Sequence, residues 1–135
     1  MADSFNFELV SPERLLLSAT VTEVVIPGTD GEMTVMAHHA PTMTTIKPGV
    51  VTVQTSEGQA DRFVVFGGFA DILPDGCTLL AESAVSVADI DRDDLAQRLQ
   101  DAKEDLADAT SDSDKQKAQE YLDQLTTLNN AIMAA

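Results

Sequence analysis

Hydrophobic and polar residues alternate in the first part of the chain, in short runs that glycine and proline separate. Phe5, Phe7 and Leu9 alternate with polar neighbours, which is typical of a β-strand with one side exposed to water. All seven glycines and all five prolines precede Cys77, and these residues mark turns because both are costly inside helices. The further extended runs lie at 21–26, 33–36, 44–46, 50–55, 62–66, 69–73, 77–80 and 84–87. This spacing predicts a β-sandwich or flattened barrel of about eight to ten short strands.

The proline and glycine pairs of this region are expected to end or to distort strands. The pair at 27–28 follows a β-branched run, the pair at 48–49 closes the short run before it, and the pair at 67–68 separates two further runs. Proline removes a donor from the ladder, and glycine in a strand marks a bulge or a close approach of two backbones. We therefore expect strands to end at the pairs 27–28 and 48–49, and a bulge or a close approach of two backbones at the pair 67–68.

After residue 87 the spacing of the hydrophobic residues changes from every second residue, as in a strand, to every third or fourth residue, as in a helix. Leu95, Leu99, Ala102 and Leu106 form one stripe of an amphipathic helix. Asp89 and Asp91 both precede this stripe, and either is a suitable N-cap. A second stripe consists of Ala118, Tyr121, Leu122, Leu125, Leu128 and Ile132.

The polar run 110–114 separates the two helical stripes. Ser113, with Gln116 three residues later, resembles a capping box for the second helix. A connection of about four to six residues makes the two helices antiparallel neighbours. The chain is thus predicted to consist of a β-sandwich, residues 1–87, followed by an α-helical hairpin, residues 88–135. Two helices cannot bury both stripes completely against each other, so the hairpin is expected to need another surface and to be a mobile element.

The net charge and the composition exclude several classes of function. The formal charge of −15 argues against nucleic acids and against anionic lipid surfaces, because both require basic patches. The single cysteine, Cys77, cannot form an internal disulfide, which fits a reducing compartment. No basic and apolar leader is visible at the N-terminus, and no apolar run approaches the length of a membrane span. We expect a soluble protein without direct membrane insertion.

Residues capable of catalysis or metal binding are few. Neighbouring strand residues point to opposite faces, so His38 and His39 make a poor chelate, and the chain has no other histidine. Cys77 has no basic neighbour in the sequence to lower its pKa. Phosphate-binding and nucleophile-elbow motifs are absent. The residue types therefore favour a non-enzymatic interaction protein, with no catalytic residue and no metal.

Six short motifs, in this order and at this spacing, resemble the epsilon subunit of bacterial F-type ATP synthases, the counterpart of the mitochondrial delta subunit. The resemblance covers the whole chain and is strongest over residues 5–87. The motifs are Leu9-Val10-Ser11-Pro12-Glu13, Gly31-Glu32, His39-Ala40-Pro41, Lys47-Pro48-Gly49, Gly67-Gly68-Phe69 and Leu80-Ala81-Glu82.

The resemblance implies a ten-stranded β-sandwich followed by a two-helix hairpin, in a non-catalytic rotor subunit of the central stalk. It implies that the sandwich binds the gamma subunit and rests on the polar loops of the c-ring, so that proton-driven rotation is coupled to ATP synthesis. By the same resemblance Gly31, Glu32 and His39 face the c-ring. The implied location is the cytoplasmic face of the bacterial inner membrane, as a peripheral subunit.

The start of the first helix departs from the relatives that bind ATP. Those relatives carry an Ile/Leu-Asp-x-x-Arg-Ala motif, whereas Asp94 and Leu95 occupy the arginine and alanine positions here. A carboxylate at a triphosphate site is unfavourable without a metal. Asp91, Arg92 and Arg98 remain the candidate nucleotide or regulatory residues, and we expect ATP and Mg binding to be weak and no cofactor to be required.

Inhibition of ATP hydrolysis by the hairpin is also expected to be weak or absent. In inhibitory relatives, basic residues of the hairpin meet an acidic loop of the beta subunit. Here the segment behind residue 87 holds five basic and twelve acidic residues, so like charges would oppose that contact.

Two other functions remain as alternatives. The first is a free-standing ligand-sensing module whose hairpin closes over a nucleotide. The second is a β-sandwich enzyme using His39 or Cys77, for which the sequence shows no set of nucleophile, base and orienting group.

Overall fold

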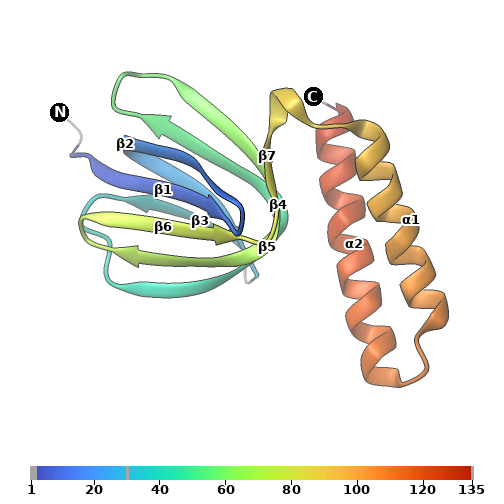
Figure 1. Ribbon diagram of the computed structural model, residues 1–135. Coiled ribbons are helices and arrows are strands. Elements are labelled where there is room, and N and C mark those ends of the chain that lie inside the picture. Colours follow the sequence, from blue (N-terminus) through green and yellow to red (C-terminus); the bar gives the residue numbers. More distant parts are fainter. Residues whose placement is uncertain (1–2, 30, 135) are drawn as a thin grey trace. The chain divides into compact units, whose positions relative to one another are not determined.

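The computed structural model describes residues 3–29 and 31–134. The chain divides into two compact units, residues 1–87 and residues 88–135. The first unit contains all the β-strands of the described residues, and the second contains two α-helices (Figure 1). The fold class predicted from the hydrophobic pattern, a β-sandwich followed by a helical hairpin, is therefore confirmed.

Seven strands build the first unit. They are β1 (Phe5–Ser11), β2 (Arg14–Gly28), β3 (Gly31–Met36), β4 (Thr42–Thr55), β5 (Ala60–Leu73), β6 (Gly76–Ala81) and β7 (Ala84–Ser86). The strands follow one another in the order β1-β6-β5-β4-β2-β3, and an additional pairing of β1 with β2 closes most of the sheet on itself. Among the described strands only β1 and β6 are parallel, and β7 pairs with β5. The result is a flattened barrel whose two layers share strands.

The expected number of ten strands and the expected strand boundary at 48–49 were wrong, whereas the boundary at 27–28 is confirmed, because β2 ends at Gly28. The structure has seven strands in the part of the chain it describes, because β4 and β5 run through the pairs at 48–49 and 67–68. β4 pairs with the second half of β5 before Pro48 and with the first half of β5 after it, so it continues through its pair. Gly67 and Gly68 have φ of 110° and 131°, which bends β5 without ending it.

The interior of the sandwich is aliphatic with a few phenylalanines. Alternate residues of β1 point inward, and Phe7 and Leu9 are fully buried. The same alternation gives β2, β4, β5 and β6 an inward row of valine, isoleucine, leucine and alanine. No polar or charged residue is buried among the described residues. The core thus stabilises the fold, and the polar and charged side chains of the described residues lie outside it.

The second unit is an antiparallel helical hairpin. A short 3₁₀ turn, η1 (Val87–Asp89), precedes α1 (Arg92–Asp108), and α2 (Asp112–Ala134) packs against α1. Asp91 is the N-cap of α1, because its Oδ1 accepts hydrogen bonds from the backbone N–H groups of Asp93 at 2.9 Å and Asp94 at 3.4 Å. Of the two predicted caps, the structure thus selects Asp91 over Asp89.

The prediction for the start of α2 was wrong by two residues. Ser111, not Ser113, is at the cap position, and its Oγ accepts a hydrogen bond from the backbone N–H of Asp114 at 3.1 Å. The connection between the helices is therefore Ala109–Ser111, shorter than expected. The stripes are buried at Leu95 and Ala102 of α1 and at Leu125, Leu128 and Ile132 of α2. Tyr121, assigned to the second stripe, is instead exposed.

Candidate protein-interaction site

A row of apolar side chains crosses the outer face of the sandwich. Val10 of β1 lies opposite Leu80 of β6, and Leu80 lies opposite Phe69 of β5. On the other side of Val10 is Leu15 of β2. Leu15, Phe69 and Leu80 are 54%, 43% and 38% exposed. These four residues are referred to below as the apolar row.

Polar residues occupy the neighbouring row of the same face. Two positions along the strands, Glu8 lies opposite Thr78, and Thr78 lies opposite Asp71. Apolar and polar side chains are therefore sorted into separate bands across three strands. Exposed apolar side chains that gather in this way mark interaction sites, whereas single ones are ordinary on any surface.

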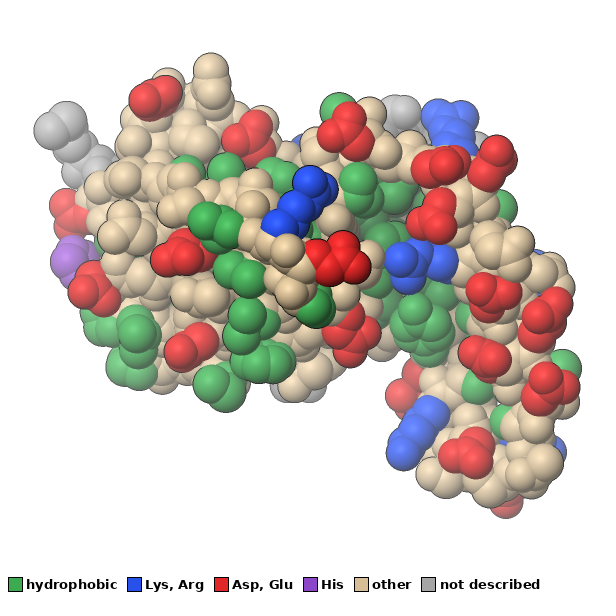
Figure 2. Space-filling model, in the orientation of Figure 1, with side chains coloured by type: hydrophobic (Ala, Val, Ile, Leu, Met, Phe, Trp, Pro, Cys, Tyr) green, Lys and Arg blue, Asp and Glu red, His purple; other side chains and the backbone are tan. Residues whose placement is uncertain are grey.

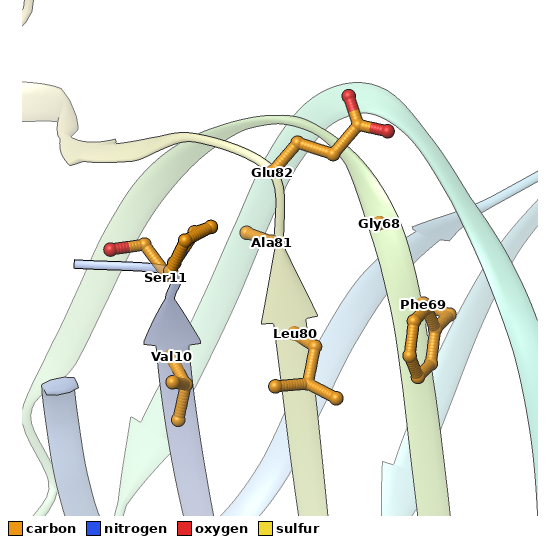
Figure 3. Close-up of a pocket in the computed structure, with 8 residues that line it drawn as sticks. Val10, Ser11, Gly68, Phe69, Leu80, Ala81 and Glu82 are labelled. Carbon is orange, nitrogen blue, oxygen red and sulfur yellow. The ribbon is translucent and has the colours of Figure 1, made fainter. Parts of the chain in front are cut away.

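Three members of the apolar row, Val10, Phe69 and Leu80, line an open groove of about 570 Å³. Figure 3 shows Val10, Leu80 and Phe69 side by side on β1, β6 and β5, with Glu82 beyond the end of β6. Ser11 and Pro12 complete the groove at the β1 end. Figure 2 shows hydrophobic side chains gathered over these strands, with carboxylates scattered around them. The groove is suited to an apolar partner surface with a polar or basic rim.

The sandwich has a second candidate surface at β3, which is the last strand in the order of the sheet. Glu32, Thr34 and Met36 are exposed, while Val35 is buried in the core. Gly31 begins β3 with a φ of 128°, a conformation that side-chain-bearing residues rarely adopt. Two of the predicted c-ring residues, Gly31 and Glu32, are thus adjacent at the start of this strand.

The third predicted c-ring residue, His39, lies beyond the other end of β3. Its Nδ1 donates a hydrogen bond to the carbonyl oxygen of Ala40 at 2.7 Å. Gly31 is the first residue of the six-residue strand β3 and His39 follows its last, so His39 is not brought together with Gly31 and Glu32. All three would meet one partner only if that partner ran along the whole strand.

His38 links three parts of the chain at this end of the sandwich. It has a φ of 67°, its backbone N–H donates to the carbonyl oxygen of Pro74 at 2.8 Å, and its Nε2 lies 2.8 Å from Oδ2 of Asp3. These contacts join the N-terminal segment, the β3–β4 connection and the β5–β6 turn. A role of His38 in stabilising the fold accounts for these contacts.

The only thiol of the chain is buried. Cys77 is 3% exposed, and burial, together with the negative charge of Asp71, raises its pKa to about 11. A thiol in this state is a poor nucleophile at neutral pH. Among residues 3–29 and 31–134, no three or more His, Cys, Asp or Glu side chains are grouped so that they could hold a metal ion. None of the described helices is both long and apolar enough to cross a bilayer.

The candidate nucleotide or regulatory residues lie in the first half of α1 or just before it, and two of them, Asp91 and Arg98, interact within that helix. The Asp91 carboxylate caps it. Nε of Arg98 donates to Oδ2 of Asp94 at 3.4 Å, an ion pair four residues apart on the helix. Arg92 is exposed, and Leu95 is buried at 1% exposure. The arginine nearest to Asp94 thus neutralises a carboxylate of its own helix.

The apolar row was not predicted from the sequence. Its members are far apart in the chain, and each belongs to a strand whose register with its neighbours no local pattern gives. Phe69 and Leu80 were assigned to strands, but alternation alone does not tell which outward residues meet. Val10 was quoted only as part of a motif.

Comparison with known proteins gives a consistent result over the whole chain. Residues 4–87 match the family model described as the ATP synthase delta/epsilon chain, β-sandwich domain. The chain is 69% identical to the ATP synthase epsilon chain of Mesorhizobium japonicum, and the match covers all of both chains. It is 64% identical to the epsilon chain of Sinorhizobium fredii over the full length of both, and 62% identical to that of Rhizobium etli over 98% of each.

Solved structures share the fold. A chain in the Euglena gracilis mitochondrial ATP synthase structure (OSCP/F1/c-ring) superposes with a TM-score of 0.75 at 24% identity, covering 96% of this chain and 81% of that one. A chain in the central stalk and c-ring structure of the Tetrahymena thermophila mitochondrial ATP synthase gives a TM-score of 0.68 at 12% identity, covering 94% and 97%. At these identities the likeness concerns the fold.

Proposed function

Since the chain belongs to the ATP synthase delta/epsilon chain family, we propose that it is a non-catalytic rotor subunit of the central stalk that couples c-ring rotation through the gamma subunit to ATP synthesis. The observation that carries this proposal is the 69% identity to an epsilon chain over the full length of both chains. A regulatory stalk subunit needs surfaces for partners, and the apolar row and β3 offer such surfaces.

The apolar row is the proposed contact for the gamma subunit. Leu15, Phe69 and Leu80 expose apolar area in one continuous band, and burying such area is the main driving force of association. A few side chains that fill well-packed pockets near the centre of an interface supply most of its binding energy. Glu82, at the end of the groove, would face a basic or polar rim.

The surface of β3 is the proposed contact for the polar loops of the c-ring. Glu32 is exposed next to the turn between β2 and β3, where its carboxylate is free to approach a basic loop residue. An exposed ion pair contributes only about 0–1 kcal/mol, so this contact would orient the sandwich more than hold it. Gly31 would let the loop approach the backbone closely, and His39 would be reached only by a partner extending along β3.

The hairpin is proposed to have little effect on hydrolysis and to bind ATP weakly. Asp91 caps α1, and Arg98 pairs with Asp94, so binding a triphosphate there would require these interactions to be replaced. The excess of acidic residues behind residue 87 would oppose docking against an acidic loop of the beta subunit. The proposed location is peripheral, on the cytoplasmic face of the bacterial inner membrane.

Reconstitution tests the coupling role. Membranes that contain the synthase without this chain are supplied with the purified chain, and ATP synthesis driven by a proton gradient is measured. Recovery of synthesis in proportion to the amount of chain bound is expected. Equal synthesis with and without the bound chain would rule out the coupling role.

A further inference from the structure

The open edge of β3 carries backbone groups that no strand of the described residues pairs. β3 bonds to β2 on one side, and the sheet order ends with it. Which of its residues bond to β2 follows from the hairpin between the two strands. Gly28 lies opposite Gly31 with two residues between them, and the pair that flanks a two-residue connection is the hydrogen-bonded kind.

The remaining pairs follow by alternation, because hydrogen-bonded and non-hydrogen-bonded pairs alternate along an antiparallel ladder. The register is one-to-one from Gly28–Gly31 to Glu23–Met36, without a bulge. Gly31, Met33 and Val35 therefore bond to β2, whereas Glu32, Thr34 and Met36 direct their N–H and C=O groups to the open edge.

Two observations on β2 support this assignment. Pro27 lies opposite Glu32, and proline has no N–H to exchange in a hydrogen-bonded pair. The backbone N–H of Thr29, the residue directly after β2, donates to the carbonyl oxygen of Thr45 of β4 at 3.0 Å, so the backbone of Thr29 faces β4. Pro27 therefore faces β4 as well and leaves Glu32 unpaired on the β2 side.

We propose that the open edge of β3 receives an extended segment of the c-ring's polar loops as an added antiparallel strand, with a lysine or arginine of that segment beside Glu32. This rests on the proposed function and specifies how the β3 surface binds. Three N–H and three C=O groups in a row fit another strand better than a helix or a side-chain surface. Glu32 is the only charged residue of β3, and its carboxylate selects a basic neighbour.

The alternation of β3 also defines the incoming segment. Glu32, Thr34 and Met36 place their side chains on the solvent side, while Met33 and Val35 point to the core. An added strand would continue both faces, with polar or basic residues outward and an apolar residue covering the partly buried Met33. A second copy of this chain is a worse occupant, because two molecules of charge −15 repel each other.

Hydrogen exchange in the assembled ATP synthase tests the added strand. The wild-type chain is exposed to deuterated water either free or in the purified synthase, and its amides are then read individually by NMR. The amides of Glu32, Thr34 and Met36 are expected to exchange at least tenfold more slowly in the synthase, while those of Met33 and Val35 are protected in both states. Unchanged exchange in a synthase that contains the chain would overturn the added strand and leave the rotor role intact; absence of the chain from the synthase would overturn both.

A proline substitution gives a second test. Thr34→Pro removes one outward N–H and no bond to β2, and proline is tolerated at the edge of a sheet. Thr34→Val keeps that N–H at similar size and is the matched control. Thr34→Pro is expected to weaken assembly into the synthase at least tenfold relative to Thr34→Val; equal assembly of the two folded variants would contradict the proposal, and if Thr34→Pro does not fold the exchange measurement decides. Protection of these amides in the free chain that grows with its concentration would instead identify a second copy as the occupant.

Discussion

Gly68 of β5 lies so close to Leu80 of β6 that a Cβ atom on the glycine would overlap the carbonyl oxygen of the leucine. The two residues belong to adjacent strands at the point where β5 bends from one layer of the sandwich to the other. Leu80 is also a member of the apolar row. The bend and the proposed gamma contact therefore depend on the same close approach of two backbones.

Gly68→Ala is expected to destabilise the sandwich strongly. The φ of 131° at Gly68 disfavours any side chain, and the overlap with Leu80 adds a second cost, so the expected loss is more than about 2 kcal/mol of unfolding free energy. Urea denaturation measures it. Gly58→Ala is the control, because Gly58 has a φ of 88° and open space around its Cβ position, and only about 1 kcal/mol should be lost there. Equal losses at the two sites would contradict the account of the bend.

The stability of the sandwich is expected to fall in alkaline solution because of Cys77. The pKa of this thiol is raised from 9.0 to about 11 by burial and by Asp71. Above pH 9 the unfolded chain loses the thiol proton while the folded chain keeps it, so the contribution is complete below pH 9 and is lost as the pH rises to about 11. The expected loss is about 2–3 kcal/mol.

Cys77→Ala is the reference for this measurement, since lysine and tyrosine residues also titrate at alkaline pH. Unfolding free energies of both proteins are measured by urea denaturation from pH 8 to pH 11. The difference between the wild type and the variant is expected to shrink over this range. Two parallel curves would show that the thiol is not held in a desolvated site.

Glu32→Lys is expected to weaken binding to the isolated c-ring about three- to tenfold at low salt. The change replaces an exposed carboxylate at the start of β3 with a positively charged side chain, which a basic loop would repel. The effect should shrink as salt is added, because exposed charges are screened. Glu57→Lys makes the same change of charge at the exposed turn between β4 and β5 and should have less effect. If both variants lose affinity equally, net charge rather than the β3 surface governs binding.

Deletion of residues 88–135 is expected to change ATP hydrolysis by the assembled enzyme less than twofold. The five basic and twelve acidic residues of this segment disfavour an inhibitory contact with an acidic loop. The sandwich is a compact unit of its own, so assembly of the truncated chain is confirmed first by its amount in the purified enzyme. A several-fold rise in hydrolysis by the truncated enzyme would mean that the hairpin inhibits after all.

The division of the chain could be predicted because it rests on local properties. Alternation such as that of Phe5, Phe7 and Leu9 and the three- to four-residue steps from Leu95 to Leu106 are set by the backbone period. Strand continuity could not be predicted in this way. Pro48 ends a strand by its local preference, but β4 is held on both sides of it by β5, and this long-range pairing outweighs the preference.

The candidate site could be predicted only in part. Gly31 and Glu32 were assigned to the c-ring contact by resemblance, and as neighbours in the sequence they lie together at the start of β3. His39 was grouped with them by resemblance, but the length of β3 separates it from both. The apolar row could not be predicted because it depends on the registers of four strands. Ser111 and Ser113 both satisfy the local rule for an N-cap, so the sequence alone did not show that Ser111 is the cap of α2.

The binding of the gamma subunit to the apolar row is the most direct test of the rotor role. The chain and the gamma subunit are co-expressed, purified through a tag on gamma, and quantified, with Phe69→Ser and Leu80→Ser as the variants. Met43→Ser is the control, since Met43 is exposed and apolar but lies outside the row. We predict a one-to-one complex with the wild type and with Met43→Ser, and at least tenfold weaker binding of the two row variants. Failure of the wild-type chain to bind gamma would contradict the rotor role, and unchanged binding of both folded row variants would contradict the assignment of the row.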